Sequence, residues 1–565
     1  MTQTKTTLPW WQTREGKSLL LVLGLTAVVV GAGIGLREPW PADEPRFTLV
    51  ARTMVESGDY MFPQRGSELY SDKPPMFMWL QAMFFHLTGS WKLAFMLPSL
   101  LSALGTVGLT FDIARRLHGV RAAKVAAIAL LFTVHFTYMM KRAQIDPVVI
   151  FLITASAYSF LRFGLTGAGV RWWYLGFFFA GLGVITKGVG VLGLFMLLAL
   201  WLGRRWSLAA DPAPKRPNAL LGIAAFLGAI GIWLVPMLIS VWREQTPEHL
   251  AYARDILLGQ TAERYVSPKH HFHPPWYFLG VMASMWLPLL LVLPWAVAAW
   301  RKARHFRRIE VLAPLLFFVF VILFFSASPA KRDMYILPAL PMLVLALTPA
   351  LLFARRRVGY QRALFGFVAL LGAGALLVGL AAAFGEPKLE RSLIEARGPH
   401  ATFEYLWWLL IGLGTAMLTL LVLRPLGRVE FRAYSALTVF WIGISLVAMP
   451  VLDGSSSARE LMTEVARRIG PDAELAVVSF KEQDLLQADR PVVDFGFKQP
   501  RQVQWQRAVV WMQTAPEKRH VLGSGQTLEA CLDPAKVVWT GVANRREMWL
   551  FTLDAVRPSC LMVSP

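Results

Sequence analysis

Residues 18–36 read SLLLVLGLTAVVVGAGIGL, a run of nineteen residues without a single charge. A helix needs about 17–25 apolar residues to cross the hydrocarbon core of a bilayer, so this run predicts a membrane-spanning helix. It is too long for the apolar part of a cleavable signal peptide, and Arg37-Glu38-Pro39 follows it in place of a small-residue cleavage site. We therefore expect the run to be retained as the first membrane anchor.

The rest of the chain has the same character. Of its 565 residues 55% are hydrophobic and 16% are charged, and the mean hydropathy is +0.48. A soluble domain carries about 25% charged residues, so this chain lacks the polar surface of a soluble fold. The sequence predicts an all-α polytopic membrane protein with about 13 transmembrane helices. The expected spans lie near 18–36, 93–113, 124–140, 148–163, 172–187, 189–203, 219–242, 276–300, 311–327, 335–354, 363–384, 403–424 and 433–450.

The net charge of +21 would suggest a nucleic-acid partner in a soluble protein. Here the basic residues gather in alternate short loops, such as those at 115–124, 204–216 and 355–362. Loops rich in Lys and Arg stay in the cytoplasm, and a cytoplasmic N-terminus places every one of these loops there. We therefore expect membrane lipids around the chain and no nucleic acid.

The loops on the other side differ from the basic ones. The first of them, 37–92, holds two amphipathic stretches at 44–57 and 74–87, as expected of helices lying at the membrane interface. Residues 1–452 are thus predicted to be the membrane domain.

Residues 453–565 are largely polar and are predicted to form a periplasmic α/β domain. Expected strands at 474–480, 491–497, 520–524 and 537–543 alternate with helices at 457–470 and about 499–513. Both cysteines, Cys531 and Cys560, lie in this segment. They would form one disulfide if the segment is extracytoplasmic; two buried free thiols are the alternative.

Ionisable groups in or beside a membrane are costly, so a cluster of them marks a candidate functional site. In the orientation set by the basic loops, many such groups fall on the extracytoplasmic side. They are Asp43, Glu44, Arg46, Asp72, Lys73, Lys141, Arg142, Asp146, Lys187, His270, His271, His273, Lys331, Arg332 and Asp333.

Asp43 and Lys73 each admit two interpretations. Asp43 either caps the helix that follows it or acts at the edge of a cavity as a general base or substrate orienter. Lys73 precedes a helix opened by Pro74 or Pro75, where a cation opposes the helix dipole. A lysine beside a helix N-terminus suits a phosphate; a lysine snorkelling to the interface is the alternative.

Further cations extend this prediction. Lys187 interrupts an apolar stretch, and Lys331 and Arg332 stand just ahead of Tyr335. Together with Arg46 they would hold a phosphodiester or a phosphate leaving group, unless they are merely scattered loop charges. His271 and His273 have the spacing of metal ligands but no acidic partner nearby, so hydrogen bonding to phosphate is preferred.

Several common sites are missing from the sequence. It contains no GxxxxGK[ST], HExxH or CxxC motif, so the usual sequence signatures of nucleotide hydrolysis, zinc proteolysis and thiol redox chemistry are missing. Nor does it show a pair of inverted, Gly/Pro-broken halves that would indicate a transporter.

A family resemblance is carried by motifs in the first loop and in four later segments. They are Asp43-Glu44-Pro45-Arg46-Phe47, Glu56–Tyr60, Tyr70–Pro75, Asp146-Pro147, Thr186-Lys187-Gly188, His271 to Tyr277, and Lys331 to Pro338. In this order they resemble the bacterial ArnT-like GT-C glycosyltransferases, the aminoarabinose–lipid A transferases of the protein O-mannosyltransferase superfamily. The resemblance implies a GT-C membrane fold followed by a periplasmic α/β domain.

The resemblance also implies roles for single residues. Asp43 matches the essential acid of the family, and Asp146 matches a second acid in the same cavity. The other matched positions, which look like the lining of a polyprenyl-phosphate cavity, are Tyr70, Lys73, Lys187, His271 and Tyr335, with Arg46 beside Asp43. No cofactor is implied; a divalent metal near Asp72 is doubtful because the family has Glu there. Pro45 and the Lys331-Arg332-Asp333 triplet also depart from the family, which leaves the sugar and the acceptor open.

The sequence therefore predicts an inverting glycosyltransferase of the bacterial inner membrane with its active site facing the periplasm. It would move a sugar from a polyprenyl-phosphate (undecaprenyl-phosphate) donor to a lipid A, glycan or protein acceptor. Asp43 and Asp146 are the expected catalytic acids, and Glu44, Asp72 and Arg332 are secondary site residues. A transporter or flippase of lipid-linked glycans is the main alternative, and a scaffold that binds partners through its periplasmic domain is a third.

Overall fold

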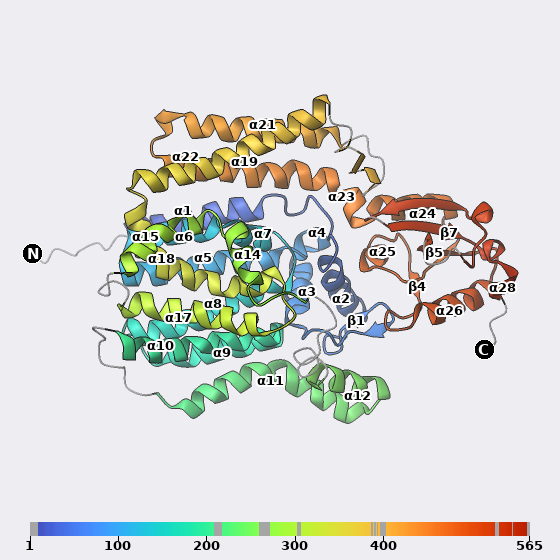
Figure 1. The fold of residues 1–565 in the computed structure, drawn as a ribbon. Coiled ribbons are helices and arrows are strands. Elements are labelled where there is room, and N and C mark those ends of the chain that lie inside the picture. The colour runs from blue at the N-terminus through green and yellow to red at the C-terminus, as the bar shows by residue number, and fades with distance from the viewer. Residues whose placement is uncertain are drawn as a thin grey trace, which may run out of the picture.

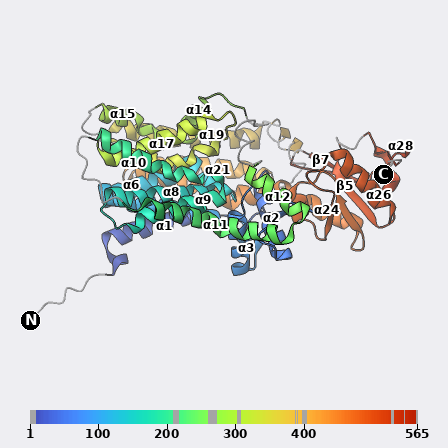
Figure 2. The ribbon, with the colours of Figure 1, turned by 90° about the horizontal axis from the view of Figure 1, so that it is seen from below.

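The computed structural model describes residues 9–207, 217–258, 272–301, 307–385, 403–525, 530–544 and 546–561, with 388, 391–392 and 394–395. His270 and His271 lie outside the described residues. A bundle of long helices fills one part of the molecule, and a smaller part built around a sheet covers one end of the bundle (Figure 1). Figure 2 shows the same arrangement from below, with the first described residues at the opposite end. We call the end of the bundle beside the sheet the sheet end, and the opposite end, where the described chain begins, the basic end.

Helices long and apolar enough to cross a membrane make up most of the bundle. Among the described residues nine qualify, or up to eleven if each of two bent helix pairs forms one span. The nine are Trp91–His118, Ile145–Leu165, Gly188–Trp206, Ala219–Glu244, Ile309–Ala327, Asp333–Ala354, Val358–Phe384, Glu404–Val422 and Val429–Ser457. The bent pairs are α6 (Val120–Leu131) with α7 (Val134–Met140), at 68°, and α14 (Tyr277–Met285) with Leu289–Trp300, at 92°. The multi-pass membrane architecture is confirmed.

The two remaining predicted spans are also helices, although they fall outside that criterion. Helix α1 (Arg14–Gly31) begins with three charged residues inside its eighteen, and α9 (Arg171–Thr186) has only sixteen residues. All thirteen predicted runs thus coincide with helices or bent helix pairs. The run at 18–36 extends past the end of α1, because residues 32–36 form turns.

The loop 37–92 covers the sheet end of the bundle. Its two predicted amphipathic helices are α2 (Glu44–Ser57) and α3 (Met76–Thr88). Between them a short antiparallel hairpin pairs β1 (Gln64–Arg65) with β2 (Glu68–Leu69). This hairpin was not predicted from the sequence, since strands of two residues carry no alternation.

The C-terminal region contains a five-stranded mixed sheet in the order β4-β3-β5-β7-β6. The strands are β3 (Glu474–Val477), β4 (Val492–Asp494), β5 (Arg519–Ser524), β6 (Trp539–Ala543) and β7 (Arg546–Phe551). Four of them were predicted. The fifth, β7, follows β6 after Asn544, whose φ of +52° turns the chain back into an antiparallel hairpin.

Alternate side chains of the sheet face two different layers, as the period of two requires. Leu475 and Val477 pack in one apolar cluster with α24 (Arg459–Ile469), and Ala476 packs in another with α26 (Arg501–Gln513). The first cluster also contains Leu49 of α2, so the sheet region and the first loop share apolar core. Cys531 and Cys560 form a disulfide.

At the basic end, one carboxylate collects several donors. Asp112, near the end of α5 (Leu97–His118), accepts hydrogen bonds from Arg115 at 2.7 Å, Arg116 at 2.6 Å and the Tyr158 hydroxyl at 2.7 Å. Arg162 approaches the same carboxylate at 3.5 Å. The close contacts tie α5 to α8 (Ile145–Leu165), so this cluster holds the bundle together.

Candidate active site

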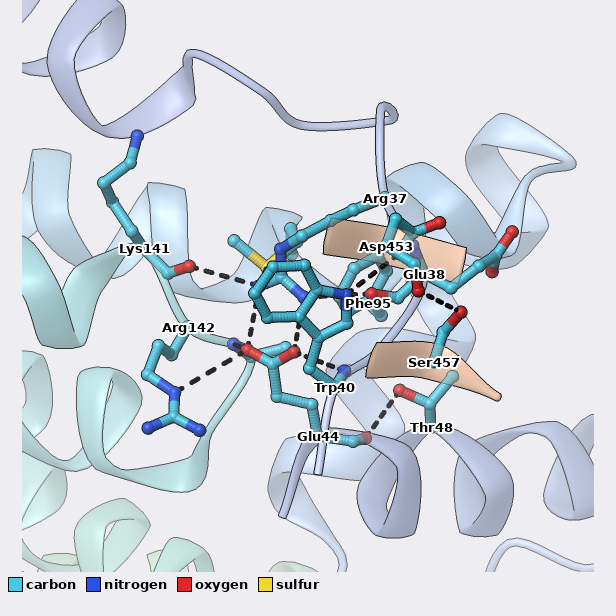
Figure 3. A network of polar contacts seen from close by, with 12 residues as sticks. Arg37, Glu38, Trp40, Glu44, Thr48, Phe95, Lys141, Arg142, Asp453 and Ser457 are labelled. Atoms are coloured by element: carbon cyan, nitrogen blue, oxygen red, sulfur yellow. Dashed lines mark hydrogen bonds and ion pairs between the residues drawn. The ribbon is translucent and has the colours of Figure 1, made fainter. Parts of the chain in front are cut away.

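The two adjacent acids Asp43 and Glu44 at the start of α2 point to different surroundings. Glu44 is buried, with a side chain that is 1% exposed. Its carboxylate accepts two hydrogen bonds from Arg37, at 2.5 and 2.9 Å, and one each from the Trp40 and Ala143 backbone N–H groups, at 2.8 and 3.0 Å. Figure 3 shows this carboxylate facing Arg37 and Arg142.

The direction of the pKa shift of Glu44 agrees with a structural role for its buried carboxylate. Burial alone would raise the pKa of Glu44, but the Arg37 charge and hydrogen bonds, with the Trp40 N–H and Arg142, outweigh it and lower that pKa. The same network reaches the end of the span Val429–Ser457, since Asp453 accepts hydrogen bonds from the Glu38 N–H and the Trp40 ring N–H. Glu44 therefore fixes the first loop against the bundle.

Asp43 is held much more loosely. It occupies the N-cap position of α2, but its side chain makes no capping hydrogen bond. Its two oxygens lie 3.6 Å from Arg46 Nη1 and 3.4 Å from Arg332 Nη2, and its side chain is 16% exposed. These separations exceed the 2.7–2.9 Å typical of a charge-assisted hydrogen bond. The Asp43 side chain thus does not cap α2 by a hydrogen bond, and its carboxylate stands between two cations at these longer contacts.

A second acid–cation pair joins the start of α8 to the end of the next helix, α9. Asp146, in the first turn of α8, accepts a hydrogen bond from Lys187 Nζ at 2.8 Å. Lys187 follows α9, and its ammonium lies 5.0 Å from the centre of the Tyr335 ring. Three predicted site residues from three segments therefore meet. Tyr335 and Arg332 both belong to the stretch 332–339, which links this group to Asp43.

The segment Tyr70–Lys73 lies beside the same end. Tyr70 is buried, and burial followed by the charge of Asp72 raises the pKa of its hydroxyl, while Arg46 and Arg65 act in the opposite direction. Lys73 donates to the Asp72 carbonyl oxygen at 3.0 Å, just before α3. The charges of Asp43 and Arg46 also act on the Tyr70 hydroxyl, so this segment lies near Asp43; phosphate binding by Lys73 stays a prediction.

Two predicted ligands have structural partners. Lys331 is 2% exposed, and its ammonium donates to the carbonyl oxygens of Ser328 and, at 3.1 Å, of His273. The His273 ring stacks on Tyr277 with centroids 4.2 Å apart. Lys331 thus closes the loop around 272–273 onto 328–331. Within the described parts of the chain, no group of three or more His, Cys, Asp and Glu side chains is arranged to hold a metal ion, so Asp72 is in no such group.

Two charged or polar contacts of this end, those of Glu482 and of His135, were not predicted from the sequence. Glu482, in the C-terminal region, pairs with Arg46 and Arg65. His135, fully buried in α7, accepts a hydrogen bond from the Trp286 ring N–H at 3.2 Å and lies 3.5 Å from Asp333. Because Trp286 occupies Nδ1 as a donor, the ring proton sits on Nε2 and faces Asp333. From the sequence, Asp333 was one of the extracytoplasmic ionisable groups and part of the 331–333 triplet, with no role of its own. No local pattern signals contacts between residues so far apart.

Comparison with known proteins gives a consistent result. The family model described as dolichyl-phosphate-mannose-protein mannosyltransferase matches residues 72–233. An undecaprenyl phosphate-alpha-4-amino-4-deoxy-L-arabinose arabinosyl transferase of Pseudomonas fluorescens is 30% identical over 65% of this chain and 65% of its own length. One from Sodalis glossinidius is 28% identical over 54% of each chain. The chain spans less than two thirds of the length of these relatives.

A solved structure extends the likeness to nearly the whole chain. The crystal structure of ArnT from Cupriavidus metallidurans bound to undecaprenyl phosphate superposes with a TM-score of 0.73, covering 98% of this chain and 100% of that one at 20% identity. At this identity the match concerns the fold. The predicted resemblance to the ArnT-like GT-C glycosyltransferases is confirmed, in sequence over part of the chain and in fold over nearly all of it.

Proposed function

We propose that the chain is an inverting glycosyltransferase that transfers a sugar from a polyprenyl-phosphate donor, with undecaprenyl phosphate as the lipid carrier. The acceptor would be a lipid A, glycan or protein hydroxyl or phosphate. The observation that carries the proposal is Asp43, a carboxylate held at 3.4–3.6 Å between Arg46 and Arg332 at the same end as the Lys187–Asp146 pair.

The cations would hold the phosphate of the donor. Arg46, Lys73 and Lys187 would bind its oxygens, with Arg332 nearby, while Tyr70 and Tyr335 would line the cavity. When the bond between the anomeric carbon and the phosphate oxygen breaks, polyprenyl phosphate leaves as an anion that these cations stabilise, so it needs no proton. Lys331 and His271 stay as predicted ligands of the carrier, and Asp72 as a secondary residue. The proposed reaction requires no cofactor.

Asp43 would act on the acceptor. It would orient the attacking oxygen opposite the leaving phosphate and take up its proton as the new glycosidic bond forms. Attack from the face opposite the leaving group inverts the anomeric configuration. For a phosphate acceptor, which has no proton to lose, Asp43 would position the group. Asp146 would keep Lys187 in place.

The proposed topology follows from charge. The basic end would face the cytoplasm by the positive-inside rule, which puts the sheet end in the periplasm of a bacterial inner membrane. We propose residues 1–452 as the membrane domain and 453–565 as a periplasmic α/β domain. A disulfide in the C-terminal region supports an oxidising compartment.

The comparisons support the class of donor. The curated relatives are named for transfer of aminoarabinose from undecaprenyl phosphate, and the similar crystal structure holds undecaprenyl phosphate. The sugar and the acceptor of this chain are not carried over from those names, because Pro45 and the 331–333 triplet are departures from the pattern that the resemblance implies.

The test is donor consumption by the purified full-length chain in proteoliposomes. Labelled undecaprenyl-phosphate aminoarabinose, with lipid A as the first acceptor, should yield free undecaprenyl phosphate and a glycosylated acceptor. Lys73→Ala should abolish turnover, whereas Lys92→Ala, an exposed lysine of the same end paired with Glu38 at 3.1 Å, should not. Movement of the labelled donor across the bilayer without its consumption would instead establish the transporter alternative.

A further inference from the structure

A buried carboxylate of the C-terminal region reaches the candidate active site. Oε1 of Glu482 accepts Arg46 Nε at 2.7 Å and Arg65 Nη2 at 2.8 Å. The Glu482 side chain is 3% exposed, against 27% for Arg46 and 14% for Arg65. Two guanidinium groups from the first loop therefore converge on one oxygen contributed from more than 400 residues later in the chain.

Local structure keeps Glu482 in this position. It is the first residue of α25 (Glu482–Leu486), whose start is fixed by a hydrogen bond from the Lys481 N–H to Asp484 at 2.8 Å. Helix α25 in turn packs against α2, which carries Arg46. The carboxylate is thus part of a rigid contact between two helices.

For Arg46 the contact fixes which edge of the guanidinium is used. Glu482 takes the Nε edge, and this leaves the terminal nitrogens on the side of Asp43, with Nη1 3.6 Å from Asp43 Oδ1. A planar guanidinium binds a phosphate best with two N–H groups side by side. Holding Arg46 by Nε presents its terminal N–H pair to a ligand beside Asp43.

For Arg65 the contact fixes a hairpin. Arg65 lies in β1, and its guanidinium also sits 4.4 Å from the centre of the Phe497 ring. The same hairpin is tied to the C-terminal region by Ser67, which donates to Asp494, and by Glu68, which accepts from Lys498 and Gln499. The hairpin is followed in the chain by residues 70–73. It therefore fixes the position of the segment that carries Lys73, the predicted phosphate-binding lysine.

Other contacts attach the C-terminal region without involving the site. Asp453 binds Glu38 and Trp40, Arg52 donates to the Leu486 carbonyl, and Leu49 packs into the apolar cluster of α24. Glu482 differs from these because both of its partners belong to, or lead into, the proposed donor site.

We propose that Glu482 is a positioning residue for donor binding, through which the C-terminal region orients Arg46 and the 64–73 segment toward the polyprenyl phosphate. This rests on the proposed function for the identity of the ligand. Its consequence is that the C-terminal α/β region completes the active site.

The experiment compares Glu482→Gln with Glu464→Gln in the full chain. Glu464 is a matched control, because its carboxylate also accepts from two arginines, Arg467 and Arg468, at 2.6–2.8 Å, but on the surface of α24. Measurements are the donor KM and kcat, the Kd for undecaprenyl phosphate by native mass spectrometry, and thermal unfolding.

Glu482→Gln should raise the donor KM and the Kd about tenfold, the cost of one charge-assisted contact, and leave kcat within about twofold. Glu464→Gln should match the wild type. In the Arg46→Gln background, Glu482→Gln should have a smaller effect than in the wild type, because only its contact with Arg65 remains. A folded Glu482→Gln protein with wild-type KM and Kd, or an effect additive with Arg46→Gln, overturns the inference.

Two further outcomes separate this inference from the proposed function. If the wild type binds undecaprenyl phosphate with a Glu482-dependent Kd but transfers no sugar, the function fails and the positioning role stands. If the wild type binds no undecaprenyl phosphate, both are overturned. Should Glu482→Gln not fold, Glu482→Asp keeps the charge and shortens the side chain by one methylene; a Kd equal to that of the wild type would then reject the role.

Discussion

Each end of the helical bundle holds a carboxylate among arginines, but the two clusters differ in how tightly they are closed. At the basic end, Asp112 accepts three hydrogen bonds of 2.6–2.7 Å from Arg115, Arg116 and Tyr158. At the sheet end, Asp43 has its two arginines at 3.4 and 3.6 Å. The carboxylate of the first cluster is closely bonded by its own protein, whereas the carboxylate of the second has only longer contacts with its two arginines.

The contrast shows that a group of arginines around an acid is not by itself evidence of a site. Short contacts satisfy the charges and hold helices together, as at Asp112. Longer contacts satisfy the charges less completely. A binding site for an anion and its acceptor needs charges that can still interact with them. Glu44, next to Asp43 in sequence, behaves like Asp112 because Arg37 and two backbone N–H groups fill its oxygens.

The largest expected effect separates the two clusters directly. Asp43→Asn should lower transfer at least about 1,000-fold, within the range for loss of a general base, and leave thermal unfolding unchanged. Asp112→Asn, the matched substitution at the basic end, should keep transfer within about twofold. Rates measured on purified proteins in detergent or liposomes decide this. If Asp43→Asn and Asp112→Asn both fold and lose the same activity, the two clusters do not differ in function.

Glu44→Gln should change stability more than any other acid substitution at the sheet end. It removes the charge that compensates Arg37, whose side chain is 4% exposed. Removing one partner of a buried ion pair costs roughly 3–5 kcal/mol. Because glutamine still accepts hydrogen bonds, we expect the free energy of unfolding to fall by about 3 kcal/mol, the lower end of that range. Thermal or SDS-induced unfolding measures it. A midpoint equal to that of Asp43→Asn would refute the division of roles.

Lys187→Gln should weaken donor binding with less effect on the chemical step. Loss of the cation paired with Asp146 at 2.8 Å should raise the donor KM about tenfold, equivalent to about 1.4 kcal/mol. Lys187→Arg keeps the charge and should recover most of the affinity. Steady-state kinetics with varied donor checks both variants, and an unchanged KM in Lys187→Gln would remove this lysine from the donor site.

The smallest effect concerns Asp484, which is buried without a full complement of cations. Burial raises its pKa to about 6 from an ordinary value of 3.8. The folded state then holds the proton more strongly than the unfolded one, so stability falls as pH rises through this window. Between pH 5 and 7 the loss is about 1 kcal/mol. Asp484→Asn should flatten the dependence of Tm on pH over that range; parallel curves for variant and wild type would contradict the assignment.

Much of the fold was predictable because membrane helices and amphipathic helices produce patterns within short stretches of sequence. The thirteen apolar runs, α2, α3 and four of the five sheet strands all follow from hydropathy and periodicity. The hairpin at 64–69 and β7 were missed, since the first is too short for a pattern and the second depends on a turn at Asn544.

The site was predictable as a set of residues but not as a geometry. The sequence indicated that Asp43, Asp146 and Lys187 would lie on one side of the membrane, and the structure places Asp146 and Lys187 in contact. It gave no sign that Glu44 would be bonded by Arg37 and two backbone N–H groups, or that Glu482 would join Arg46. The Arg46–Glu482 pair joins residues more than 400 positions apart, where only the fold decides which charges meet.

The central claim is that a lipid-borne phosphate binds at the sheet end beside Asp43. A structure of the full chain with undecaprenyl phosphate in a lipid nanodisc tests it most directly. We predict phosphate density within hydrogen-bonding distance, about 2.7–3.2 Å, of Arg46, Lys73 or Lys187, next to Asp43. Phosphate bound instead at the basic end, around the arginines of Asp112, would contradict the account.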